Sequence, residues 1–194
     1  AQPRLVGGWF LAVMRSCGRA VYLVYVGIFA IESSLSERIG GMAASLASMG
    51  LFFAPLMLRW MQTRSLRAAV RTGFLCSGSC FVAAALLSAW PWASIALLLL
   101  GAYFLVLLDI CGGLPFLMSV KPSQRTEMSA VYSTFRDVAN IVTPAVVWLV
   151  LQLGPLAAVF AAGGLGLLGA WAVAGRMHPQ LGVPPGERSR PTRV

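Results

Sequence analysis

Five ionisable side chains of this chain lie inside apolar stretches long enough to cross a membrane, and they are the residues that could do chemistry. They are Arg15, Arg19, Asp109, Arg136 and Asp137. A charge in the hydrocarbon of a bilayer costs a few kcal/mol by insertion scales. Such a side chain therefore turns toward protein or water, where it pairs with an opposite charge or serves a solute or ion pathway.

The stretch 128–150, MSAVYSTFRDVANIVTPAVVWLV, shows this pattern most clearly. Arg136 and Asp137 lie about 13 Å from its first residue at 1.5 Å per residue, which places them near mid-membrane. At helical spacing Arg136 shares a polar stripe with Asn140. We expect this stripe to face a polar interior, and we expect Pro144 to kink the helix.

The five charges permit two interpretations. In one, Asp109 and Asp137 pair with arginines and hold the helices together. In the other, they form a binding or coupling site, in which three arginines against two aspartates favour an anionic solute and a buried aspartate carries a proton. Arg15 lies nearer the predicted cytoplasmic surface, and we expect its guanidinium to extend toward water. With their polar and aromatic neighbours, the candidate site residues are Arg19, Tyr22, Asp109, Tyr132, Arg136, Asp137 and Asn140.

Cysteine and histidine offer no comparable constellation. Cys76 and Cys80 are one helical turn apart, but no histidine or further cysteine accompanies them, so we expect small core residues rather than metal ligands. The single histidine, His178, follows the last apolar run. The sequence has no Gly-x-Ser-x-Gly, His-Glu-x-x-His or phosphate-loop motif. We expect neither an enzyme nor a bound cofactor.

Composition and hydropathy predict an all-α integral membrane protein. The chain is 58% hydrophobic and 11% charged, whereas soluble domains carry about 25% charged residues. Six apolar segments are each long enough to span a bilayer. They run over about 9–32, 35–60, 66–90, 92–118, 128–150 and 155–175. We expect a six-helix transmembrane domain over 1–178 and a disordered cytoplasmic tail over 179–194.

The basic residues predict the orientation of the bundle. Eleven of them flank the segments on one side, and Arg38 alone lies on the other. The eleven are Arg4, Arg59, Arg64, Arg67, Arg71, Lys121, Arg125, Arg176, Arg188, Arg190 and Arg193. The positive-inside rule places both termini in the cytoplasm. The net charge of +9 therefore reflects membrane topology rather than nucleic-acid binding. The excess of arginine over lysine is typical of a GC-rich bacterium, so we expect a multi-pass protein of the bacterial inner membrane.

The sequence also predicts how the helices begin and pack. Ser34 to Glu37 matches a capping box with Ser34 as N-cap, and Pro91 and Pro155 suit first-turn positions. Small residues recur every four positions in two segments and predict close helix packing. These rows are Gly40, Ala44 and Ser48, and Ala158, Ala162, Gly166, Ala170 and Ala174. We expect the charged first, fourth and fifth helices to line a shared polar interior, and the third and sixth to lie at the periphery.

The whole pattern resembles the C-terminal six-helix half of a major facilitator superfamily transporter, over about residues 5–178. The segment GGLPFLMSVKPSQRTEMSAVYSTFRDVANIVTPAV looks like the tenth and eleventh helices of that family, where a basic loop precedes a helix with a mid-span polar residue. The loop PLMLRWMQTRSLRAAVRTG keeps the basic character of the family's loop motif but lacks its aspartate and glycine. The gating role of that motif is therefore not carried over.

The resemblance implies alternating access between two six-helix halves, with an N-terminal half of the same protein as partner. The predicted activity is proton-coupled transport of a small, anionic solute across the lipid bilayer. The competing hypothesis is a self-contained six-helix scaffold or complex subunit, in which the buried charges only pair helices.

Overall fold

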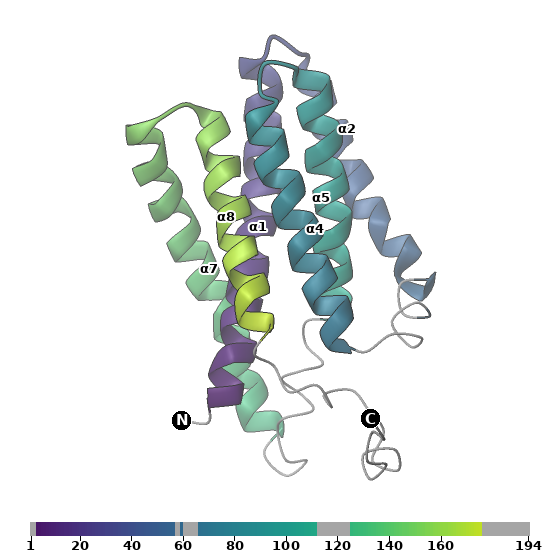
Figure 1. The fold of residues 1–194 in the computed structure, drawn as a ribbon, viewed down its shortest axis with the longest axis vertical. Coiled ribbons are helices and arrows are strands. Elements are labelled where there is room, and N and C mark those ends of the chain that lie inside the picture. The colour runs from purple at the N-terminus through teal and green to yellow at the C-terminus, as the bar shows by residue number, and fades with distance from the viewer. Residues whose placement is uncertain (1–2, 57–58, 60–65, 112–124, 176–194) are drawn as a thin grey trace, which may run out of the picture.

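The computed structural model describes residues 3–56, 59, 66–111 and 125–175, and within these ranges the chain is helical with short turns and no strand (Figure 1). The helices are α1 (Pro3–Glu32), α2 (Glu37–Met49), the 3₁₀ helix η1 (Gly50–Phe53), α4 (Leu66–Leu86), α5 (Pro91–Cys111), α7 (Arg125–Leu153) and α8 (Leu156–Ala174).

Six spans in the described residues are long and apolar enough to cross a membrane, as the hydropathy pattern predicts. Some helix ends differ from the prediction. Helices α1 and α7 begin earlier, at Pro3 and Arg125, and α7 runs on to Leu153. The predicted end of the fourth span, 112–118, and the predicted tail, 179–194, lie outside the described residues.

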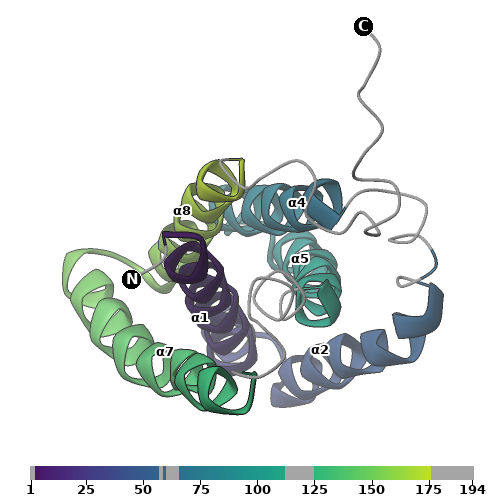
Figure 2. The same cartoon turned by 90° about the horizontal axis from the view of Figure 1, so that it is seen from below.

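The helices form three rows when the bundle is viewed along its length (Figure 2). Helices α4 and α8 pack side by side in the back row, and α1 and α5 form the middle row. Helices α7 and α2 lie in the front row, where α7 contacts α1 and α2 contacts both α1 and α5. We call the end with the short α1–α2, α4–α5 and α7–α8 turns the upper end of the bundle.

The spans differ in how far they are buried within the described bundle. Only 22% of the most apolar window of α7 is buried, compared with 44% for α4 and 50% for α5. Within the described bundle, α7 is therefore an edge helix, and α4 belongs to the packed part. The reason is that α4 contacts both α8 and α5 extensively, whereas α7 contacts mainly α1. Which helices face lipid and which line a polar interior stays a prediction.

Glycines bring α4 and α8 into backbone contact. A Cβ added at Gly164 would lie 2.9 Å from the carbonyl oxygen of Gly78 and 2.9 Å from the backbone nitrogen of Val82. The predicted row of small residues on α8 is only partly the cause. Its members Ala170 and Ala174 are fully buried, but the closest contact is made by Gly164, which is not in the row.

Helices α1 and α2 also cross through glycines. A Cβ at Gly40 would lie 2.6 Å from the Cα of Gly27, so the predicted row on α2 makes its close contact at its first member. Its last member, Ser48, is exposed. Close approach of two backbones through small residues is how membrane helices gain packing energy without a hydrophobic driving force.

The helix starts differ in register from the sequence prediction. The N-cap of α2 is Ser36, whose side chain accepts a hydrogen bond from a backbone N–H two residues on, at 3.2 Å. The predicted capping box is therefore wrong by two residues. Ser34 instead adopts φ 60°, a left-handed conformation that turns the chain between α1 and α2. Pro91 begins α5 as predicted, whereas Pro155 is the N-cap of α8 rather than a first-turn residue.

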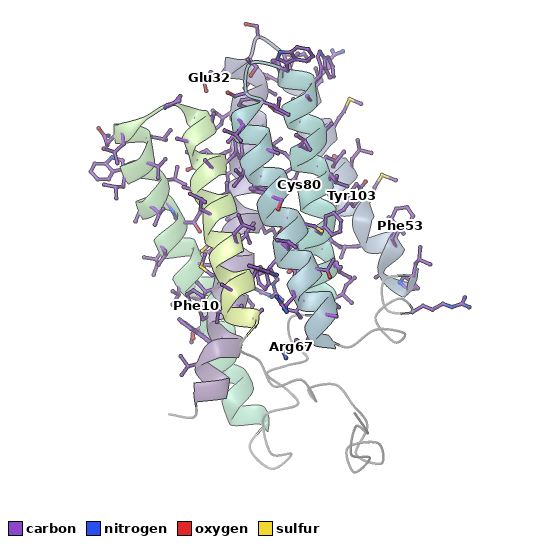
Figure 3. All side chains as sticks on the ribbon, in the orientation of Figure 1. Phe10, Glu32, Phe53, Arg67, Cys80 and Tyr103 are labelled. Carbon is purple, nitrogen blue, oxygen red and sulfur yellow. The ribbon has the colours of Figure 1, made fainter. Side chains whose placement is uncertain are left out.

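Two arginines of α4 hold the lower end of α8. Arg67 donates a hydrogen bond from Nη2 to the carbonyl oxygen of Gly175, and the Arg71 guanidinium carbon lies 5.2 Å from the centre of the Trp171 ring. The last carbonyls of a helix lack intrahelical partners and carry partial negative charge, which favours cations there. Figure 3 shows Arg67 at the lower end of the bundle and Glu32 at the upper end.

We predict that Gly164→Ala destabilises the bundle by about 1–3 kcal/mol, because the added methyl group meets backbone atoms that cannot move independently. The matched control is Gly169→Ala on the same helix, where a Cβ meets nothing within 4 Å. That change should be neutral or stabilise by up to about 1 kcal/mol through helix propensity. Thermal unfolding of both variants in the same detergent checks the prediction, and equal melting temperatures would contradict it.

Candidate functional site

Asp109, near the lower end of α5, bridges two arginines of α1. Its Oδ1 lies 3.0 Å from Nε of Arg15, and its Oδ2 accepts a hydrogen bond from Nη1 of Arg19. Among the described residues, these are the ion pairs that the structure contains. Residues one turn apart on a helix lie on the same face, which is why both arginines reach one carboxylate.

Arg15 is the buried member of this cluster. Its side chain is only 9% exposed, its Nη1 donates to the carbonyl oxygen of Leu108 at 3.1 Å, and its guanidinium carbon lies 5.4 Å from the centre of the Phe135 ring. The expectation that Arg15 extends toward water is therefore wrong. Its guanidinium is held inside the bundle because a carboxylate, a backbone carbonyl and an aromatic face meet there, and together they can stabilise a buried cation.

Arg19 is the exposed member. Its side chain is 47% exposed, and its hydrogen bond to Asp109 connects α1 with α5. Beside it lies a hollow between α1, the α2–η1 segment and α5, with a volume of about 20 Å³. Its polar lining is Arg19, Asp109, Tyr22 and Ser48. This volume is enough for one water molecule.

Tyr22 is buried, and its hydroxyl donates to the carbonyl oxygen of Ala43 at 2.7 Å. The ring of Tyr22 thus contributes to the wall of the hollow, while its polar atom is engaged by α2. A second tyrosine, Tyr103 of α5, donates to the carbonyl oxygen of Leu46 at 3.1 Å (Figure 3). Two tyrosines therefore attach α2 to the middle row through its backbone.

The contact with Tyr103 coincides with a change of helix type in α2. At Gly50 the chain passes into η1, and the N–H of Gly50 bonds to the carbonyl oxygens of Ala47 and Ser48. The carbonyl oxygen of Leu46 accepts from Tyr103 at this break. A Cβ at Gly50 would lie 2.7 Å from the Tyr103 ring, so glycine permits this close contact. Pro55 follows and cannot donate a backbone hydrogen bond, which favours such a break.

The predicted site residues of α7 do not join the cluster. Arg136, Asp137 and Asn140 are all exposed, and α7 runs through Pro144 as one helix. The side chain of Tyr132 lies outside the described part of the chain. The structure thus brings together Arg19, Tyr22 and Asp109, and it places the three α7 residues separately on the edge helix.

Phe135 connects the two groups. The guanidinium carbon of Arg136 lies 5.9 Å from the ring centre that Arg15 also approaches, and Phe135 itself is buried against α1. A hydrogen bond from Nε1 of Trp9 to Oγ1 of Thr134, at 3.2 Å, adds to the α1–α7 contact. Sequence reasoning missed the roles of Phe135 and Arg15. The helical spacing of Phe135 in 128–150 could have indicated a buried position, but not which cation it would meet.

The charged residues lie at different distances from the upper ends of their helices. Counting at 1.5 Å per residue, Arg19 lies about 20 Å down, and Asp109 and Arg136 lie about 26–27 Å down. Helix α7 runs from Arg125 to Leu153 and is longer than the stretch 128–150. The mid-membrane position of Arg136 stays a prediction.

No family model, curated protein or solved structure matches this chain. In the described residues, no group of three His, Cys, Asp or Glu side chains could hold a metal ion.

We predict that Asp109→Asn destabilises the bundle by about 3–5 kcal/mol, because it leaves the buried Arg15 without its counter-charge. Asp137→Asn is the matched control, since Asp137 is exposed and a surface substitution changes stability by about 0.5 kcal/mol or less. Unfolding of both variants in lipid nanodiscs gives the comparison. Equal stability of the two would show that Arg15 does not need the Asp109 charge.

Proposed function

We propose that this chain forms one half of a secondary transporter that moves a small solute across a membrane by alternating access. The observation that carries the proposal is Arg19, a half-exposed guanidinium within a membrane-spanning helix. An arginine at this depth does not face lipid without cost, so its surroundings are water or protein. A solute-binding face at the front of α1 and α5 would meet this requirement.

The edge helix α7 supports the same face. Its exposed Arg136, Asp137 and Asn140 would be as unfavourable in lipid as Arg19 is. A second six-helix unit packed against the front row would cover them and leave a polar cavity between the two units. In the proposed mechanism Arg19 binds the solute, and Asp109 or Asp137 carries the coupled proton. The partner expected from the family resemblance is the N-terminal half of the same protein.

The proposed setting is a bacterial inner membrane with the lower end of the bundle in the cytoplasm. The support is the position of described basic residues, since Arg67 lies at the lower end of the bundle and Arg71, one turn on, contacts Trp171 near the lower end of α8. The first residues of α1 and the last of α8 lie at this same end. Both termini would then be cytoplasmic.

A structural role is the second candidate, and a specific observation favours it. Arg15 and Asp109 are enclosed by the protein and connect α1 with α5, and Phe135 extends the contact to α7. Buried ion pairs of this kind can hold two helices together without taking part in solute binding. The chain would then be a membrane scaffold or a subunit of a larger complex.

Proteoliposomes containing the full natural protein separate the two candidates. A pH-sensitive dye inside the vesicles reports proton movement as each solute of a chemically diverse panel is added. We expect at least one solute to drive proton flux with the wild type, and Arg19→Gln to abolish it. The control is Arg38→Gln, an exposed arginine at the opposite end of the bundle, which should retain the flux. Unchanged flux in a folded Arg19→Gln protein would remove Arg19 from the site.

Orientation is tested by cysteine labelling in intact cells with a reagent that does not cross membranes. In a protein whose native cysteines are replaced, Ser34→Cys should react directly, because Ser34 is exposed in the turn at the upper end. Arg59→Cys, also at an exposed position, should react only after the cells are permeabilised. The reverse result would invert the proposed topology.

A further inference from the structure

We infer that the hollow beside Arg19 binds a small organic carboxylate, whose oxygens replace Oδ2 of Asp109 at Arg19 while Arg15 retains Asp109. This inference rests on the proposed transport function and names the solute class of the same site. The carboxylate of Asp109 then pairs with the Arg19 guanidinium while no solute is bound, and the solute replaces it there.

The two arginines differ in how firmly they are held. Arg15 is 9% exposed and contacts Asp109, the carbonyl oxygen of Leu108 and the Phe135 ring. Arg19 is 47% exposed, and its bond to Asp109 is the contact that the structure gives it. An incoming anion can therefore reach Arg19 and not Arg15. Because Arg15 keeps its contact with Oδ1, Asp109 stays paired when Arg19 changes partner.

Charge balance favours a monoanion. Two guanidinium groups and one carboxylate leave a single positive charge in the cluster, and a monoanionic ligand neutralises it. A dianion would leave an excess negative charge in a region of low dielectric. Arginine offers planar donors that match the two oxygens of a carboxylate, and Arg19 has donors beyond the Nη1 that contacts Asp109.

The apolar residues that line the hollow predict that the part of the ligand beyond its carboxylate is apolar. Apart from its polar residues, the hollow is lined by aliphatic side chains of three helices, among them Leu23, Leu51 and Leu105. At about 20 Å³ the hollow must widen to take more than a water molecule. The wall most able to move is η1, which carries Leu51, because its described side chains are largely exposed and a 3₁₀ turn has weak hydrogen-bond geometry.

The test is protection of Arg19 from phenylglyoxal, which modifies accessible arginines, in the full protein in phosphatidylcholine nanodiscs. The probe is benzoate, and benzamide is its uncharged counterpart of the same shape. Peptide mass spectrometry follows Arg19 and, as an internal reference, the exposed Arg38 of α2. At a benzoate concentration about ten times its Kd, modification of Arg19 should slow about tenfold. Arg38 should be unaffected, and benzamide should protect neither.

Further arms define the ligand class and the role of Asp109. Acetate, inorganic phosphate and chloride should protect Arg19 less than benzoate does at equal concentration. In Asp109→Asn the internal competitor is absent, so half-protection should occur at a benzoate concentration lower by about two- to fivefold. If Asp109→Asn does not fold, the comparison of benzoate with benzamide in the wild type is sufficient to test whether the site recognises a carboxylate. Arg19→Gln should lose the rise in melting temperature that benzoate gives the wild type.

Three outcomes overturn the inference. They are no protection by benzoate, equal protection of Arg19 and Arg38, and protection by phosphate or chloride as strong as that by benzoate. Because this assay needs no gradient, its result is independent of transport. Proton flux with an uncharged solute, without benzoate protection, would leave the transporter proposal standing. Benzoate protection without flux for any solute would retain the carboxylate site and overturn transport.

Discussion

A carboxylate placed between two guanidinium groups is the interaction on which the arrangement of the middle helices depends. Asp109, near the lower end of α5, pairs with both guanidinium groups, and it supplies the counter-charge for Arg15 inside the bundle. This pairing requirement fixes the rotation of α1 relative to α5, because both arginines must present the same face. Through the Phe135 ring the requirement extends to α7, whose position on α1 places an aromatic face over the Arg15 cation.

The bundle divides into a close-packed back and a more exposed front. At the back, Gly78 and Gly164 let α4 and α8 approach until their backbones touch. At the front, α2 and α7 are mostly exposed and α2 contacts the middle row through Gly27 and Gly40 and through two tyrosine hydroxyls. Packing energy in a bilayer comes from close contact rather than from hydrophobic transfer. The back is therefore the most closely packed part of the described bundle.

The sequence predicts the number and approximate limits of the spans because length and hydropathy decide whether a segment can cross a bilayer. It also identifies Arg19 and Asp109 as unusual. It does not predict that Arg15 is buried while Arg19, one turn away, is exposed, because that depends on which neighbours surround each side chain. The spacing of small residues also does not identify Gly164 as the residue where α8 contacts the α4 backbone. Several rows of small residues on the alanine-rich α8 satisfy the same four-residue pattern. The ends of α7 differ from the predicted 128–150 because they depend on turns that periodicity does not define.

The two interpretations of the membrane charges need not apply to every residue alike, because Arg15 and Arg19 contact the same aspartate but differ in exposure. Arg15 is enclosed and makes several contacts, so its removal would first affect stability. Arg19 shares the same aspartate yet remains half exposed beside a hollow, so its removal would leave the Arg15–Asp109 contact in place. In the proposed site, Asp109 thus stays paired with Arg15, which stabilises the bundle, and pairs reversibly with Arg19. Pairing of charges within a membrane bundle is therefore compatible with a binding role, provided that the two cations differ in exposure as Arg15 and Arg19 do.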